Sequence, residues 1–272
     1  MKQSSNRLLF FMVMVGTISC SPGKYAATNK VYRNKVRDIN HQLSLREPGI
    51  DTLGLTASFI GSVNFNIRKP NFVVLHHTAQ GSCEQTVNTF LNTKTEVSSH
   101  YVICKDGTVI QMLNDYLRGW HAGAGRWGNV TDLNSVSLGI EIDNNGTEPY
   151  TQPQVNSLLR LLSGLKRQYN IPAANFIGHG DIAPSRKVDP GALFPWKALA
   201  DSGFGLWYKD TTGLVVPDSF DVRTALRIIG YDVRDIIKAS EAFRRHFILS
   251  DNKGALNIAE RKVLFAVMKE YY

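Results

Sequence analysis

The stretch Asn71-Phe72-Val73-Val74-Leu75-His76-His77 is a short apolar run that ends in two histidines. A continuous run of this length, rich in β-branched residues, is typical of a strand that is buried on both faces. His76 then lies at the end of the strand, where its side chain can project from a rigid edge into a cleft. Successive strand side chains point to opposite faces, so only one of His76 and His77 can enter such a site.

Further strands and helices alternate along the chain after this run. The expected elements are a helix over Glu84 to Leu91, a hairpin over Tyr101 to Met112 with Asp-Gly at its turn, a strand over Ser135 to Ile142, a helix with Thr151 as N-cap and Pro153 in its first turn, and a strand over Phe176 to Gly178. Because strands and helices interleave, we predict an α/β domain with a mixed central β-sheet flanked by helices, at residues 50–212.

The pattern changes after Trp207. Three short amphipathic helices are expected, over Asp221 to Ile229, Ile236 to Phe247 and Asn257 to Tyr271. Asn257 and Glu260 have the spacing of a capping box. We therefore predict a small C-terminal three-helix domain at residues 213–272.

The first twenty residues have the layout of an export signal. Met1 to Arg7 is basic, and the apolar run from Leu8 to Ser19 is shorter than the ~20 residues that a membrane span needs. The ending Thr17-Ile18-Ser19-Cys20 resembles a bacterial lipoprotein signal, although Thr17 replaces the usual leucine; an ordinary cleaved signal with an incidental cysteine is the alternative. We expect a signal at residues 1–20, a lipid on Cys20, a polar tether at residues 21–49, and a location on the periplasmic face of the outer membrane.

Charge and cysteine content restrict the function less strongly. The formal net charge is +8, but no block of lysines and arginines indicates nucleic-acid binding. Apart from Cys20, the chain contains only Cys83 and Cys104. The sequence leaves open whether these two form a disulfide or stay free thiols.

Three residues on separate expected elements could hold a metal. His76 and His179 each follow a strand, and Asp189 lies ten residues beyond His179. Two imidazoles and a carboxylate supply three corners of a tetrahedral zinc site, and the fourth stays open for water, as catalytic zinc requires. Each residue could alternatively be an ordinary core or surface side chain.

Five ordered motifs carry a resemblance to a known family. They are Val73-Val74-Leu75-His76-His77-Thr78-Ala79, Val97-Ser98-Ser99-His100-Tyr101-Val102-Ile103, Trp120-His121-Ala122-Gly123, Asn134-Ser135-Val136-Ser137-Leu138-Gly139-Ile140-Glu141, and Gly178-His179-Gly180-Asp181-Ile182-Ala183-Pro184 through Lys187-Val188-Asp189-Pro190-Gly191. Over Asn71 to Trp196 the chain resembles the zinc-dependent N-acetylmuramoyl-L-alanine amidases of type 2, which share a fold with phage lysozyme-amidases and animal peptidoglycan-recognition proteins.

The resemblance implies an activity and roles for particular residues. The activity is hydrolysis of the amide between the lactyl group of N-acetylmuramic acid and L-alanine in peptidoglycan or muropeptides. His76, His179 and Asp189 would bind Zn²⁺. Glu141 would be the general base, and Lys187 would stabilise the developing oxyanion.

A substrate groove is expected beside these residues. We predict that Trp120, His121, Trp127 and Asn134 line it, because aromatic faces stack on sugar rings and polar groups bind the peptide stem. Trp127 could equally be a core residue. His100 is not expected to be a ligand.

The C-terminal helices resemble a peptidoglycan-binding domain, over Thr224 to Tyr231 and Ala239 to Phe247. Wall binding by these helices is a hypothesis. Two other functions are considered for the whole chain: a non-catalytic peptidoglycan receptor, and a zinc peptidase that cuts within the stem peptide. The presence of every expected ligand argues against the receptor, and the ordered motifs argue against the peptidase.

Overall fold

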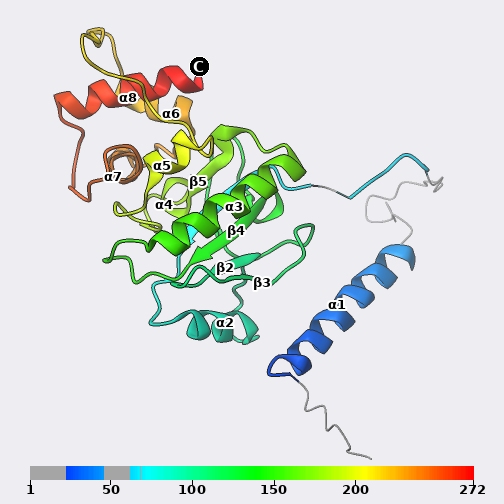
Figure 1. The fold of residues 1–272 in the computed structure, drawn as a ribbon. Helices are drawn as coiled ribbons and strands as arrows, with labels where there is room; N and C mark the ends of the chain where they lie inside the picture. The colour runs from blue at the N-terminus through cyan, green and yellow to red at the C-terminus, as the bar shows by residue number, and fades with distance from the viewer. Residues whose placement is uncertain (1–22, 46–61, 68) are drawn as a thin grey trace, which may run out of the picture. The chain divides into compact units, whose positions relative to one another are not determined.

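The computed structural model describes residues 23–45, 62–67 and 69–272 (Figure 1). The chain divides into two compact units, Met1–Asn64 and Phe65–Tyr272. In the first unit, helix α1 (Ala26–Leu45) occupies most of the expected polar tether. The predicted signal, Cys20 and the predicted domain start at residue 50 lie outside the described residues.

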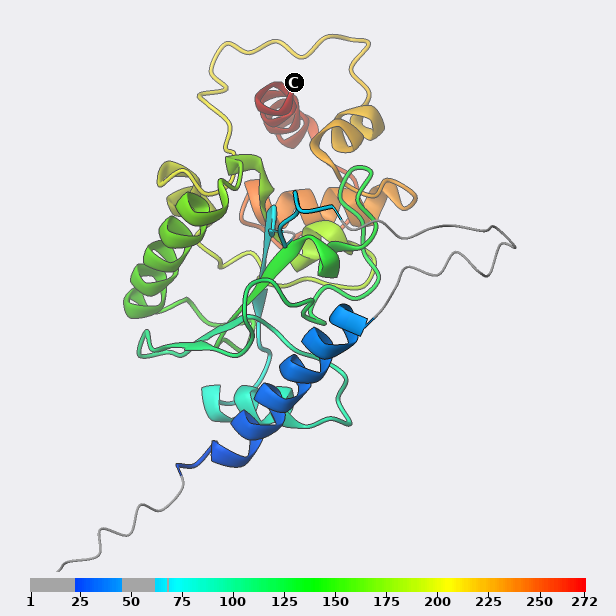
Figure 2. The same ribbon diagram turned by 90° about the vertical axis from the view of Figure 1, so that its right-hand side faces the viewer.

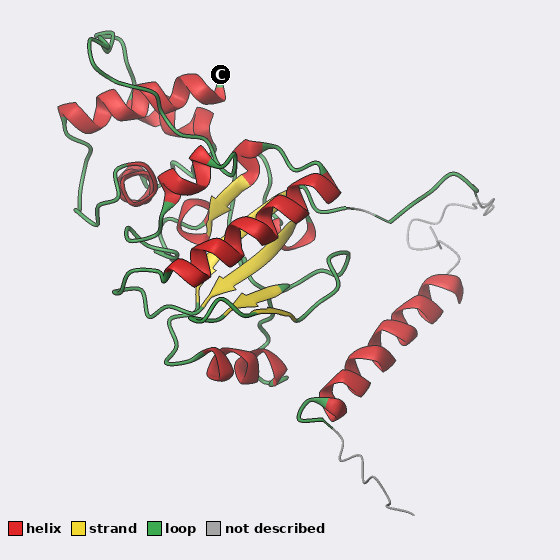
Figure 3. Ribbon diagram, viewed as in Figure 1, coloured by secondary structure: helices red, strands yellow, loops and turns green. Residues whose placement is uncertain are grey.

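The second unit contains the sheet and the remaining helices (Figures 1 and 3). Its strands are β1 (Phe72–His77), β2 (Tyr101–Ile103), β3 (Val109–Gln111), β4 (Ser137–Ile142) and β5 (Phe176–Gly178). Its α-helices are α2 (Cys83–Leu91), α3 (Gln152–Tyr169), α4 (His179–Ile182), α5 (Trp196–Asp201), α6 (Val222–Ile229), α7 (Ile236–Phe247) and α8 (Ile258–Tyr271). Two 3₁₀ turns, η2 (Leu133–Ser135) and η3 (Ala173–Asn175), precede β4 and β5.

The five strands form one mixed sheet in the order β3-β2-β4-β1-β5. β1 lies parallel to both β4 and β5, and β2 lies parallel to β4. Only β3 is antiparallel, because the Asp106-Gly107 turn returns the chain directly onto β2. The predicted mixed α/β sheet is confirmed, and β1, whose penultimate residue is His76, lies between β4 and β5.

Alternate residues of β1 enter two different cores. Val73 and Leu75 pack in a cluster with Leu158 and Leu162 of α3. Val74 packs on the opposite face, in a cluster that includes residues of α4, α6, α7 and α8. Figure 2 shows α3 on one side of the sheet and α4 on the other. His76 follows Val74 on the α4 side, so the pleat of the strand decides which histidine faces that side.

Two helices begin with the N-terminal capping residues that the sequence predicted. Thr151 caps α3 through a hydrogen bond from the Gln154 backbone N–H, and the Gln154 side chain completes a capping box. Asn257 and Glu260 form the same arrangement at α8. These side chains satisfy backbone N–H groups that would otherwise lack a partner in the first turn.

The C-terminal helices share their core with the sheet. Val74 of β1 and Ile177 of β5 lie in the same cluster as Leu226 of α6, Phe243 of α7 and Leu264 of α8. Residues 65–272 thus form one compact unit, and the expected division near residue 213 falls inside it. The change in sequence pattern gave no sign of this shared core, because helical periodicity shows that a face is apolar but not what covers it.

Two further features concern the setting of the protein. Cys83 at the start of α2 and Cys104 after β2 form a disulfide, which settles the question that the sequence left open. Within the described ranges, no helix is long and apolar enough to cross a membrane.

Candidate functional site

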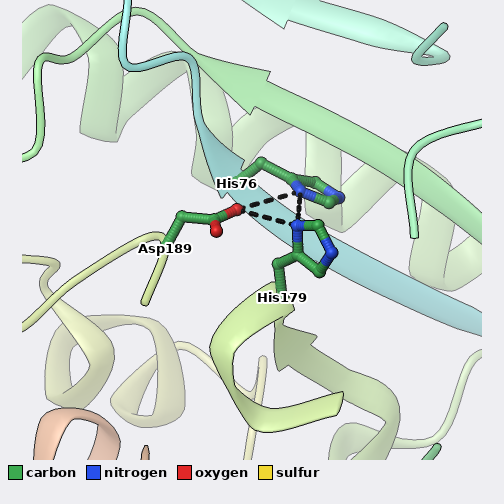
Figure 4. Close-up of side chains that lie close together, drawn as sticks. All are labelled: His76, His179 and Asp189. Carbon is green, nitrogen blue, oxygen red and sulfur yellow. Dashed lines mark hydrogen bonds and ion pairs between the residues drawn. The ribbon is translucent and has the colours of Figure 1, made fainter. Parts of the chain in front are cut away.

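The candidate site is a cluster of two imidazoles and one carboxylate at one end of the sheet. His76 is the penultimate residue of β1, His179 begins α4 directly after β5, and Asp189 lies in the loop that follows α4 (Figure 4). β1 and β5 are parallel neighbours, so both histidines emerge at the same edge of the sheet. All three side chains are at most 7% exposed.

The potential ligand atoms form a nearly equilateral triangle. His76 Nδ1 lies 3.0 Å from His179 Nδ1, and both nitrogens lie 3.1 Å from Asp189 Oδ2. Zinc bonds of about 2.0–2.1 Å in a tetrahedral site imply ligand–ligand distances of roughly 3.3 Å. The observed triangle is only slightly tighter, so the three residues fit one face of a tetrahedron and can hold a metal ion.

The protonation of these groups also suits metal binding. Burial, and after it the neighbouring His179, lower the pKa of His76 to about 4. Burial would raise the pKa of Asp189, but hydrogen bonds from His179 and His76 hold it well below its usual value. At neutral pH the site therefore offers a neutral imidazole and a carboxylate, the forms in which these ligands bind metals.

Glu141 lies beside this triangle because of strand register. His76 of β1 and Glu141 of β4 are directly paired, and the Glu141 carboxylate lies 3.9 Å from His76 Nδ1. Burial raises the pKa of Glu141 well above its usual value, and the negative charge of Asp189 adds to this rise. A raised pKa makes the Glu141 carboxylate a stronger proton acceptor, which suits a general base.

Lys187 provides a positive charge at the same place. It is partly buried, two residues before Asp189. Its charge opposes the rise in the pKa of Glu141 and contributes to the lowered pKa of His76. Lys187 therefore lies close enough to the predicted general base and to one predicted ligand to change the pKa of both.

Residues 66–192 match the family model described as N-acetylmuramoyl-L-alanine amidase. This segment contains the metal-binding triangle, Glu141 and Lys187. This segment of the chain is similar to that amidase family.

Named relatives and solved structures support the assignment. N-acetylmuramoyl-L-alanine amidase AmiD of Escherichia coli is 29% identical over 73% of this chain and 82% of its own length. 1,6-Anhydro-N-acetylmuramyl-L-alanine amidase AmpD of the same organism is 39% identical over 37% of this chain and 55% of its own length.

The fold is also shared with solved members. A structure of E. coli AmiD in complex with the substrate anhydro-N-acetylmuramic acid-L-Ala-D-gamma-Glu-L-Lys aligns with a TM-score of 0.68 and 27% identity, over 78% of this chain and 93% of that one. AmpDh3 of Pseudomonas aeruginosa aligns with a TM-score of 0.68 and 29% identity, over 80% and 99%. These alignments cover more of the chain than the family segment does.

The four residues expected to line a substrate groove lie in different environments. Trp120 is 47% exposed and remains a candidate for substrate contact. Trp127 is 6% exposed and lies against Tyr231, with ring centroids 5.0 Å apart. It belongs to the core shared with the C-terminal helices, which is the alternative that the sequence left open for this residue.

His121 and Asn134 both form hydrogen bonds within the protein. His121 is 9% exposed and lies behind His76, with its Nδ1 3.1 Å from His76 Nε2. Asn134 Oδ1 accepts hydrogen bonds from the backbone N–H groups of His121 and Ala122, at 3.1 and 2.9 Å. These contacts occupy both ring nitrogens of His121 and the amide oxygen of Asn134, and contact of either residue with substrate stays a prediction.

His77 and His100 have structural roles, as the sequence suggested. The His77 ring contacts the Pro190 carbonyl and is outside the triangle. His100 donates from Nε2 to the Leu117 carbonyl and accepts the Gly139 N–H at Nδ1, so both of its ring nitrogens are occupied by backbone.

Several residues near the site were not selected from the sequence. Ser137 and Gly139 lie on the same face of β4 as Glu141, at spacings of two residues. Strand alternation could have identified them, since every second residue of β4 must share the face of Glu141. Arg186 donates to the Ala122 and Ala124 carbonyls, and no local pattern indicated this contact across 62 to 64 residues of chain.

Proposed function

We propose that this protein is a zinc-dependent amidase that hydrolyses the bond between the lactyl group of N-acetylmuramic acid and L-alanine. The observation that carries the proposal is the triangle of His76, His179 and Asp189 with Glu141 beside it. Two imidazoles and one carboxylate form a typical catalytic zinc set, and three protein ligands leave a coordination position for water or substrate. The match of residues 66–192 to the amidase family model and the named relatives support the same activity.

Zinc and two protein residues would have separate roles in the hydrolysis. Zinc in this site would polarise the amide carbonyl and lower the pKa of water. Glu141 is placed to accept a proton from the attacking water and to pass it to the leaving nitrogen. Lys187 would stabilise the negative charge that develops on the carbonyl oxygen, where a fixed cation in a water-poor site is most effective.

The substrate class proposed is muropeptides, including those with an anhydro-muramyl end. E. coli AmiD has been solved with such a substrate, and AmpD is named for this specificity. Trp120 offers an exposed aromatic face beside the buried His121, at which a sugar ring or stem residue could stack.

The proposed location is the periplasmic face of the outer membrane, with a lipid on Cys20. The N-terminal sequence supports export, and the Cys83–Cys104 disulfide is typical of proteins in oxidising compartments. Metabolic labelling with a radioactive fatty acid, followed by membrane fractionation, tests the proposal. Label on the wild type but not on Cys20→Ala is the expected result; an unlabelled, soluble wild-type protein would reject the anchor.

The activity is tested by digesting purified muropeptides with the protein from Ser21 onward, followed by mass spectrometry. Stem peptides that start with L-alanine should be released, should disappear with a chelator and should return with added zinc. Cleavage within the stem would instead indicate a peptidase. Intact muropeptides that bind to a folded, zinc-loaded protein would favour the receptor.

A further inference from the structure

Helix α1 carries a narrow apolar stripe along one side. Its apolar residues recur at spacings of four, three and four, so they share one face of the helix. Ile39 is 37% exposed and Leu43 is 71% exposed. The stripe consists of Tyr32, Val36, Ile39 and Leu43, and Tyr25, seven residues before Tyr32, continues it directly before the helix.

The sides of α1 beside this stripe are basic. Arg33 borders the stripe on one side and Lys35 on the other. The exposed cationic side chains of the segment are Lys24, Lys30, Arg33, Lys35 and Arg37, and its one acidic residue is Asp38. Five positive charges minus one negative charge give this segment a formal charge of +4. An apolar stripe bordered by cations is typical of a helix that lies in a membrane interface.

The helix is also close in sequence to the proposed lipid. α1 begins at Ala26, six residues after Cys20. Six residues span at most about 20 Å, so an acyl chain on Cys20 would keep the first turn of α1 near the bilayer. Tyr25 and Tyr32 suit this level of a membrane, because a tyrosine ring has an apolar body and a polar hydroxyl.

A second copy of α1 suits the stripe less well than an anionic surface does. The spacing is also that of a coiled-coil seam. In a pair of such helices, however, Arg33 and Lys35 of both copies would lie beside the seam, and Asp38 lies on another side of the helix. Pairing would therefore bring like charges together, whereas an anionic surface attracts the same cations.

We propose that α1, with Lys24 and Tyr25, binds an anionic phospholipid surface, its apolar stripe in the interface and its cations on the headgroups. This inference rests on the proposed membrane location and goes beyond the lipid on Cys20, because it assigns a second attachment that needs no acyl chain. Two such attachments together give stable anchoring where a single weak one does not.

Binding of the unacylated protein to vesicles is the direct test. The chain from Ser21 onward is sedimented with sucrose-loaded vesicles of phosphatidylethanolamine and phosphatidylglycerol, and with vesicles of phosphatidylcholine alone. We expect binding to the first that is about 10-fold or more tighter than to the second, and that weakens with added salt because salt screens exposed charges. Equal binding to both vesicles, or binding to neither, would overturn the proposal.

The apolar stripe is tested by Ile39→Gln/Leu43→Gln. This variant should bind the phosphatidylglycerol vesicles at least about 10-fold more weakly, because two apolar side chains no longer enter the interface. Val31→Gln is the matched control, since Val31 is 64% exposed on the same helix but lies off the stripe. Wild-type binding by the stripe variant would contradict the proposed orientation of α1.

The cations are tested by Arg33→Gln/Lys35→Gln. Each lysine or arginine near an anionic membrane strengthens binding about five-fold, so this variant should bind about 25-fold more weakly. Lys94→Gln/Lys253→Gln removes the same charge from exposed lysines of the second unit. An equal loss in this control would assign the binding to net charge and not to α1.

Other occupants of the stripe give different results. A dimer in sedimentation velocity that Ile39→Gln/Leu43→Gln abolishes, without vesicle binding by the wild type, would assign the stripe to a second copy. Sedimentation with insoluble peptidoglycan that depends on α1, again without vesicle binding, would assign it to the cell wall. Either result overturns the proposal.

The proposals also fail separately. α1 belongs to a different unit from the candidate site, so all of these variants should keep the melting temperature and the release of stem peptides from soluble muropeptides. Vesicle binding without such release would contradict the amidase function alone. Vesicle binding by a protein that takes up no fatty acid would contradict the lipid on Cys20 alone.

Discussion

Asp181 Oδ2 accepts a hydrogen bond of 2.7 Å from His246 Nδ1. Asp181 lies on α4, two residues after His179, and His246 lies on α7. The other carboxylate oxygen of Asp181 accepts a 2.8 Å hydrogen bond from the Tyr231 hydroxyl. All of these side chains are buried, so the helix that begins with a candidate metal ligand is held by the C-terminal part of the chain.

Truncation tests this dependence. A chain that ends at Asp218 would expose Val74, Ile177 and Ile182, which pack in the shared core. Because burial of apolar surface is the main stabilising term, we expect the truncated protein to lose its cooperative thermal transition. Circular dichroism melting measures this. A truncated protein that melts like the full chain and still binds zinc would show that the C-terminal helices are a separate domain.

Glu141→Gln removes the proposed general base but keeps the size of the side chain. We expect kcat to fall by about 10²–10⁴-fold, because general acid–base catalysis contributes on this scale. Zinc content and melting temperature should match the wild type, since Glu141 is not part of the triangle. Muropeptide release and metal analysis are measured on the same sample. A variant with wild-type kcat would assign the proton transfer to another group.

Lys187→Met should lower kcat with little change in KM. The positive charge of Lys187 acts on both Glu141 and His76, so the reacting centre lies within its field. Removing one stabilising group of an oxyanion typically costs about 10²–10³-fold in kcat. Steady-state kinetics provide the measurement, with the exposed Lys197→Met as control, whose charge pairs with Asp201. An effect confined to KM would place Lys187 in ground-state binding instead.

The Arg244–Glu260 pair predicts a pH-dependent stability. Arg244 donates to both carboxylate oxygens of Glu260, at 2.7 and 2.9 Å, and both residues are buried. Glu260→Gln would leave a buried guanidinium without its partner charge, which costs about 3 kcal/mol of unfolding free energy. Hydrogen bonds from Arg244 lower the pKa of Glu260 below its ordinary 4.5.

The sign of the pH effect follows from this lowered pKa. The folded state holds the ionised form of Glu260, so its contribution is fully present above about pH 4.5 and is lost as the pH falls through the folded pKa. Denaturant unfolding of wild type and Glu260→Gln should therefore differ at pH 7, and the difference should shrink as the pH falls below 4.5 toward the folded pKa of Glu260. An equal difference at both pH values would contradict the role of the pair.

The Cys83–Cys104 disulfide should stabilise the sheet end of the fold. It joins residues 21 positions apart, and closing a loop of this size is worth about 3 kcal/mol in the chain-entropy model. Reductant should lower the unfolding free energy of the wild type and leave the double variant Cys83→Ser/Cys104→Ser unchanged. Equal unfolding free energies of the reduced and the oxidised wild type would contradict a stabilising role of the disulfide.

The sequence by itself determined which elements form and which chemistry is present. The apolar run before His76 predicted β1, and the turn and cap signals at Gly107 and Thr151 predicted the hairpin and α3, because these depend on local backbone conformation. The motifs around His179 and Asp189 indicated a metal site, because the residue types alone show which side chains are able to bind a metal.

Only the tertiary structure decided where the polar atoms of His121 and Asn134 go. Their residue types suit a substrate groove equally well, but His121 fits against Gly139 and Asn134 binds backbone, and these contacts depend on packing between segments. The same holds for Trp127 and the C-terminal helices, whose apolar faces needed the sheet to complete one core. Periodicity along a chain reports that a side chain is buried, whereas its partner is set by the three-dimensional path of residues far away in sequence.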